Sequence, residues 1–258
     1  MELMVSVKDG EPWADDSGGD GLPIVLLHPG VGDSRIWDGI TPRLTQRHRV
    51  IRYDVRGFGR SPEPTVRYSL VEDLLAVLDH FELDRVALVG SSMGGATAVS
   101  LALDAPGRLA ALGLFCPGVT GYAALESPRL MAEIGELAQA GDMDGLVALG
   151  LRTWATAGTG DDAEATAQLR SAIPGWFTSH PYQVPEAPAF ERLGELDVPC
   201  LLALGEQDQP EVIRCNEDMA ASIPGCRPVR LADCDHFPSL RHPDTVAGLV
   251  LELCDGRR

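Results

Sequence analysis

The feature that most constrains the fold is a change of pattern over residues 86–98, where an apolar run gives way to small, helix-forming residues. The run at 86–89 is typical of a strand buried on both faces. It is followed by the pattern Gly90-x-Ser92-x-Gly94, in which the glycines have no Cβ atom to clash in a strained turn. We predict a strand, a sharp turn and a helix, with the Ser92 hydroxyl raised above the strand end.

A serine at such a turn suggests a nucleophile. The first N–H groups of the following helix have no acceptor within the helix and lie at its positive dipole end. They would therefore stabilise an anion that forms beside Ser92. The bare pattern also arises by chance in a chain with 28 glycines, so the rest of the chain must supply a base, an acid and an oxyanion hole.

Strand and helix patterns alternate along most of the chain. The predicted strands cover residues 3–7, 24–28, 50–54, 86–90, 109–116, 199–205 and 228–231, and the predicted helices cover 34–46, 69–81, 93–103, 212–222 and 243–254. Residues 15–21 and 55–64 are rich in glycine, aspartate or proline and are predicted to be loops. This order predicts an α/β fold with a mostly parallel, twisted sheet flanked by helices.

The alternation stops between residues 119 and 188. This stretch is rich in alanine, is helix-like, is interrupted by glycine and proline, and contains Trp154 and Trp176. We predict a helical cap at 119–188 inserted into a core made of 1–118 and 189–258. Trp154, Trp176, Phe177 and Tyr182 are candidates to line a substrate pocket between cap and core, although such aromatic residues also serve as packing.

The net charge and the cysteine spacing disfavour several classes of binding partner. A net charge of −17 repels nucleic acid and anionic membranes and favours neutral or cationic small molecules. The six cysteines form no C-x-x-C pair and no metal-ligand spacing with histidine, so we expect reduced thiols and no metal or cofactor. No signal peptide or membrane-spanning run is evident. We therefore expect a cytoplasmic protein, with a homodimer left open.

Later strand-end loops offer partners for Ser92. Asp208 follows the apolar run at 199–205, and His236 follows the next predicted strand. Histidine supplies a base near neutral pH, and a carboxylate fixes its tautomer and stabilises its charged form. Glu206 is the main rival for the acid, whereas Asp235 is too close in sequence to His236 to reach its ring comfortably.

The oxyanion hole is expected to combine two backbone N–H groups. One belongs to Met93, directly after the nucleophile, and the other to Gly30 or Val31, after the strand at 24–28. His28 ends that strand beside the site. It either makes a structural hydrogen bond within this loop or contacts the substrate.

These motifs together resemble the α/β-hydrolase family, in particular the group that includes 3-oxoadipate enol-lactonases, meta-cleavage C–C hydrolases and small carboxylesterases. The residues that carry the resemblance are HPGVGDS at 28–34, YDVRGFGRS at 53–61, GSSMGG at 90–95, GEQD at 205–208 and DHFP at 235–238. Pro29 departs from the family, since many members have glycine after the histidine. It removes an N–H and leaves open which loop residue is the second donor.

The resulting hypothesis is a cofactor-free serine hydrolase that cleaves an ester, lactone or related acyl bond of a small, neutral or apolar molecule. Ser92 would attack, His236 would relay protons and Asp208 would orient His236. Three alternatives on the same scaffold remain open: a C–C bond hydrolase, a non-hydrolytic lyase or haloperoxidase, and a ligand-binding receptor with slow turnover.

Overall fold

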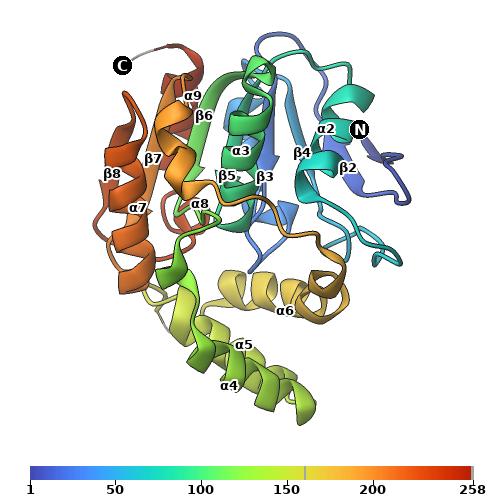
Figure 1. Cartoon of the computed structure of the whole chain (residues 1–258), viewed down its shortest axis with the longest axis vertical. Coiled ribbons are helices and arrows are strands. Elements are labelled where there is room, and N and C mark those ends of the chain that lie inside the picture. The colour runs from blue at the N-terminus through green and yellow to red at the C-terminus, as the bar shows by residue number, and fades with distance from the viewer. Residues whose placement is uncertain (160, 257–258) are drawn as a thin grey trace.

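A computed structural model of the chain describes residues 1–159 and 161–256. Residue 160 of the predicted cap and residues 257–258 of the predicted core lie outside the described residues. Within the described part, eight strands form one sheet in the order β1-β2-β4-β3-β5-β6-β7-β8 (Figure 1). The strands are β1 (Glu2–Met4), β2 (Trp13–Asp16), β3 (Ile24–Leu27), β4 (Val50–Tyr53), β5 (Val86–Ser91), β6 (Leu109–Phe115), β7 (Cys200–Gly205) and β8 (Arg227–Leu231).

Helices cover both faces of the sheet. They are α1 (Thr41–Leu44), α2 (Leu70–His80), α3 (Met93–Asp104), α4 (Pro128–Gln139), α5 (Met143–Trp154), α6 (Ala163–Thr178), α7 (Pro210–Ser222), α8 (Pro238–Arg241) and α9 (Pro243–Cys254), with 3-10 turns at Ser34–Trp37, Pro106–Arg108, Ala123–Leu125, His180–Tyr182 and Phe190–Glu195. In Figure 1, α2, α3 and α7 lie in front of the sheet, and α9 lies behind it. None of the helices in the described residues is long and apolar enough to cross a membrane.

The sheet is parallel from β4 to β8 and antiparallel only where β1 and β2 join it. Side chains of a strand alternate between its two faces. In β3, Val25 and Leu27 pack into the core under α2, α3 and α7, whereas Ile24 and Leu26 pack into the core under α1 and α9. Both faces are therefore apolar, and the predicted fold class is confirmed.

Two local predictions are wrong. The predicted loop at 15–21 begins inside β2, because Asp15 and Asp16 extend a strand that pairs with β1 and β4. The predicted helix at 34–46 is broken into a 3-10 turn and the short α1. Pro42 lies in the first turn of α1, where proline is tolerated; a continuous helix would have placed it in the interior, where it lacks an N–H and clashes.

The helices α4, α5 and α6 form the insertion between β6 and β7, and in Figure 1 they lie together beyond one end of the sheet. Each begins at an N-cap side chain that accepts a backbone N–H bond. The caps are Ser127 for α4, Asp142 for α5 and Asp162 for α6. These local signals fix where the three helices of the insertion begin.

Candidate active site

Ser92 occupies the sharp turn between β5 and α3, with φ +50° and ψ −113°. A residue with a side chain rarely adopts positive φ, so neighbouring structure must hold it there. A Cβ atom at Gly90 would collide with the carbonyl oxygen of Gly94, and one at Gly94 would collide with the carbonyl oxygen of Leu27. The two glycines thus allow the close backbone approach that raises Ser92 at the start of α3.

His236 and Asp208 meet from two neighbouring loops. Asp208 follows β7 and His236 follows β8, and His236 Nδ1 lies 2.6 Å from Asp208 Oδ2. Both side chains are buried. An ionised carboxylate only accepts hydrogen bonds, so Nδ1 donates and Nε2 is left with its lone pair. The other carboxylate oxygen of Asp208 accepts from the Gln209 N–H at 2.7 Å, which fixes the carboxylate in the loop.

The surroundings of His236 have opposing effects on its charge. Burial disfavours the charged ring, but the Asp208 carboxylate outweighs burial, and the pKa of His236 rises above its ordinary value of 6.5. Asp235 adds a smaller effect in the same direction. The ring can therefore take up a proton readily while it stays hydrogen-bonded to Asp208.

Ser92 and His236 line one cavity of about 440 Å³. Its other walls come from the segment before α4, the first turn of that helix, the end of α5 and the start of α7. These lining residues are Pro117, Gly118, Ala124, Leu125, Glu126, Ser127, Pro128, Arg129, Leu130, Trp154, Gln209, Glu211 and Val212. A ligand in this cavity would therefore contact both the insertion and the strand-end loops.

The loop after β3 lies beside the turn that carries Ser92. A Cβ atom at Gly30 would be only 3.7 Å from the Met93 side chain. The carbonyl oxygen of Gly30 accepts from Trp176 Nε1 at 2.6 Å, and the carbonyl oxygen of Pro29 accepts from His28 Nδ1 at 2.9 Å. In a trans peptide the N–H points away from the carbonyl. These bonds thus orient the N–H groups of Gly30 and Val31, which both remain candidates for the second donor.

His28 has both ring nitrogens engaged by backbone. Nδ1 bonds the carbonyl oxygen of Pro29, and Nε2 lies 2.9 Å from the Val55 nitrogen. The Val55 N–H can only donate, so Nε2 accepts and Nδ1 carries the proton. His28 therefore ties the loop after β3 to the loop after β4, and this placement favours loop support over substrate contact.

The four aromatic candidates of the insertion separate into two pairs. Trp154 lines the cavity, and its ring packs edge-on against Trp176 with 5.7 Å between centroids. Trp176 in turn holds the loop after β3 through Gly30. Phe177 and Tyr182 are exposed and are not among the residues that line the cavity.

The rival acids have other partners. The Glu206 carboxylate lies at the surface, 2.6 Å from Arg230. Asp235 is fully buried, and its Oδ1 accepts from the Phe237 N–H at 3.0 Å. Neither of these two contacts involves the His236 ring, which leaves Asp208 as its carboxylate partner.

Sequence reasoning missed a clamp built on Asp235. Its Oδ2 accepts from the Ala157 N–H at 2.9 Å and from Arg241 at 3.0 and 2.8 Å. Arg241 also reaches Asp162 at 2.6 Å. The His236 N–H donates to the Trp154 carbonyl oxygen at 3.2 Å. The loop that carries His236 is thus fastened to the segment between α5 and α6.

One group of possible metal ligands includes the same residues. The Cys116 sulfur and single ligand atoms of Asp208 and His236 lie within 4.8 Å of one another. Burial raises the pKa of the Cys116 thiol well above its usual range, so the thiol stays protonated and is a poor ligand. The Asp208 and His236 atoms are already joined by a short hydrogen bond. The chemistry of these three side chains therefore fits a metal ion poorly.

Known proteins resemble this chain in sequence and structure. The profile of the alpha/beta hydrolase fold family matches residues 23–187. A 2-hydroxy-6-oxo-2,4-heptadienoate hydrolase from Pseudomonas putida is 42% identical over 98 residues, or 35% of this chain and 36% of that protein. The matches to the first curated relatives cover only about a third of those proteins.

Two further matches extend over nearly the whole chain. A pimeloyl-[acyl-carrier protein] methyl ester esterase from Methylococcus capsulatus is 29% identical over 92% of this chain and 96% of its own length. The solved structure of Est816, described as an N-acyl homoserine lactone degrading enzyme, is 29% identical with a TM-score of 0.79, covering 96% of this chain and 99% of its own. The expected resemblance is confirmed, and the chain belongs to the alpha/beta hydrolase fold family.

Proposed function

We propose that the protein is a cofactor-free serine hydrolase that cleaves an ester or lactone bond of a small molecule. The observation that carries the proposal is the 2.6 Å bond between His236 and Asp208, because His236 lines the same cavity as Ser92, which lies at a strained turn. A nucleophile after β5, an orienting carboxylate after β7 and a base after β8 suit acyl transfer.

Each residue has a separate role in this mechanism. The Ser92 hydroxyl attacks the carbonyl carbon while His236 Nε2 takes its proton. The N–H of Met93 and that of Gly30 or Val31 stabilise the oxyanion. His236 then protonates the leaving alcohol. Water attacks the acyl-enzyme with His236 again as base, and the acid is released as Ser92 is restored.

The cavity supports a small and largely apolar substrate. Leu125, Leu130, Trp154 and Val212 supply apolar walls. Glu126 and Glu211 also line it, and the whole chain is strongly acidic, so an anionic group would be disfavoured. The full-length relatives described as a methyl ester esterase and a lactone-degrading enzyme support the two bond types. We also propose that residues 119–188 form a cap on a core made of residues 1–118 and 189–258.

A second candidate is hydrolysis of a dienoate. It is favoured by the 42% identity to the heptadienoate hydrolase, which is higher than that to the esterase but covers only 98 residues. The same serine, histidine and aspartate would serve in that reaction.

The test combines an active-site label with a substrate panel. We expect a fluorophosphonate to label Ser92, as mapped by mass spectrometry, and p-nitrophenyl esters or lactones to be hydrolysed. Ser92→Ala should retain the fold and lose activity by about 10⁶-fold. Labelling at another serine would contradict the mechanism. Activity on dienoates alone would select the second candidate, and tight binding without turnover would select a receptor.

A further inference from the structure

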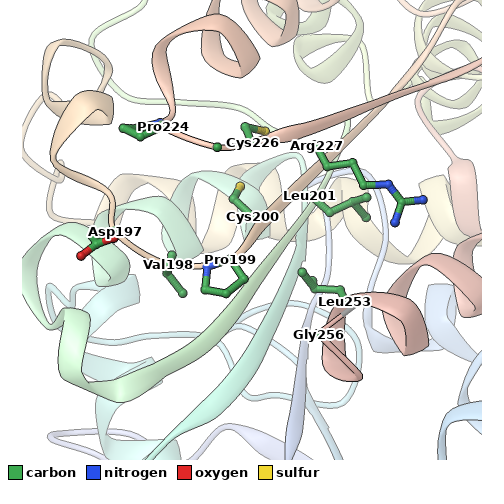
Figure 2. A pocket seen from close by; sticks show the side chains of 11 residues that line it. Asp197, Val198, Pro199, Cys200, Leu201, Pro224, Cys226, Arg227, Leu253 and Gly256 are labelled. Carbon is green, nitrogen blue, oxygen red and sulfur yellow. The ribbon is translucent and has the colours of Figure 1, made fainter. Parts of the chain in front are cut away.

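A second cavity lies at the opposite end of the sheet from Ser92. It has a volume of about 560 Å³ and is bordered by the start of β7, the turn before β8 and the end of α9. Figure 2 shows its lining residues. Two of them are cysteines, and all six cysteines of the chain are free thiols.

The two cysteines lie side by side at the start of two neighbouring strands. Cys200 is the first residue of β7, and Cys226 directly precedes β8. The residues that follow them, Leu201 and Arg227, are paired in the parallel register. In Figure 2 the Cys200 sulfur points toward the segment that carries Cys226. Adjacent strands lie about 4.8 Å apart, which falls within the range of Cα separations that a disulfide can span.

The two thiols differ in how readily they ionise. A hydrogen bond with Cys200 lowers the pKa of Cys226, while that hydrogen bond and burial raise the pKa of Cys200. Cys226 is partly exposed and Cys200 is buried. Cys226 is therefore the thiol of the pair that ionises more readily, and Cys200 is the neighbouring thiol that stays protonated.

Cys254 provides an internal comparison. It is also partly exposed, and it lies near the end of α9. Burial, with a contribution from Asp255, raises the pKa of Cys254 to about 12. Cys226 and Cys254 are both partly exposed, but their pKa values shift in opposite directions. A difference in reactivity between them would therefore not follow from exposure alone.

We propose that Cys226 and Cys200 form an oxidant-sensitive thiol pair, with Cys226 as the attacking thiol and Cys200 as the resolving thiol. The oxidant class is a peroxide. The Cys226 thiolate attacks one oxygen of hydrogen peroxide, the O–O bond breaks, and hydroxide leaves and takes up the proton lost by the thiol. The Cys200 sulfur then attacks the sulfenic acid, which releases a second water and forms the S–S bond. Two electrons pass from the two thiols to the peroxide.

The experiment uses the full chain and does not depend on the hydrolase reaction. The protein is treated with hydrogen peroxide, its remaining thiols are blocked with iodoacetamide, and the digest is examined by mass spectrometry. We expect a peptide pair linked through Cys200 and Cys226. In the untreated protein, Cys226 should be alkylated about tenfold faster than Cys254 at mildly alkaline pH.

Two variants sharpen the test. Cys254→Ser should form the linked pair as the parent does, whereas Cys226→Ser should not form it. If Cys226→Ser fails to fold, the alkylation rates of the unmodified protein still decide the matter. Equal rates for Cys226 and Cys254, or peroxide treatment that yields no peptide linked through Cys200 and Cys226, would overturn the proposal.

Discussion

Arg241 donates two hydrogen bonds to Oδ2 of Asp235, the residue that directly precedes His236. Arg241 also binds Asp162, the N-cap of α6. Burial opposes the charge on Arg241, but Asp162 and Asp235 outweigh it and raise the pKa of its guanidinium. One arginine thus holds two carboxylates, one in the loop of the proposed base and one in the insertion that lines the same cavity.

We predict that Arg241→Gln destabilises the fold. Asp235 is completely buried, and the substitution would leave its charge without a cation. The free energy of unfolding should fall by about 3 kcal/mol, measured in urea. Arg230→Gln is the matched control, because the pairs of Arg230 with Glu206 and Glu217 are exposed and should contribute less than about 1 kcal/mol. Equal losses in the two variants would argue against the clamp.

A second prediction concerns pH. The proposed base must be neutral to accept a proton, so kcat/KM should decline as pH falls through the pKa of His236, which lies above 6.5. In Asp208→Asn the carboxylate charge is lost and burial dominates, so the pKa falls and the acidic limb moves to lower pH. Activity at its optimum should drop by roughly 10⁴-fold. A pH–rate profile measures both effects, and an unmoved limb would contradict the assigned pair.

The glycines around Ser92 allow a third prediction. In Gly94→Ala the new methyl group would meet the Leu27 backbone, so the turn must shift. We expect a loss of about 1–3 kcal/mol in the free energy of unfolding and much slower fluorophosphonate labelling. Gly135→Ala is the control, since nothing lies within 4 Å of the added atom in the middle of α4. There alanine should stabilise the protein by about 0.5–1 kcal/mol. A similar loss of stability in both variants would contradict the claim that the close approach of Gly94 to Leu27 excludes a side chain.

The parallel part of the fold could be predicted because its strands are buried on both faces. Residues 24–27 and 86–89 read as apolar runs, and α9 was predicted with the bounds that the structure shows. Strand β2 was not predicted because half of its residues are aspartate, which is uncommon in strands. Its place depends on pairing with β1 and β4, and Asp16 is neutralised by Arg49, which no local pattern reveals.

The candidate site also contains residues that the sequence predicts and contacts that it does not reveal. Ser92, Asp208 and His236 could be predicted because each lies in a turn or loop after a predicted strand and is of the residue type that its role needs. The clamp of Asp235 and Arg241 joins residues six apart in sequence to Asp162, far away in the chain, and only the packed insertion brings the three together. The exposure of Phe177 also follows from the packing of the insertion rather than from residue type.

The fourth prediction isolates the hydrogen bond between Trp176 and Gly30. Trp176→Phe keeps an aromatic ring against Trp154 but removes the N–H that holds the Gly30 carbonyl oxygen at 2.6 Å. A net hydrogen bond of this kind contributes about 1 kcal/mol. If it orients the loop N–H groups toward the oxyanion, its loss should lower kcat several-fold and leave KM nearly unchanged, since the oxyanion forms only after binding.

Trp154→Phe is the matched comparison for that variant. Trp154 lines the cavity but holds the loop only through its ring contact with Trp176. Its truncation removes part of the apolar wall, which acts on bound substrate and transition state alike, so KM should rise while kcat changes little. Steady-state kinetics on one ester substrate separate the two effects. A rise in KM for Trp176→Phe with kcat preserved would make Trp176 a wall of the cavity rather than a support of the oxyanion loop.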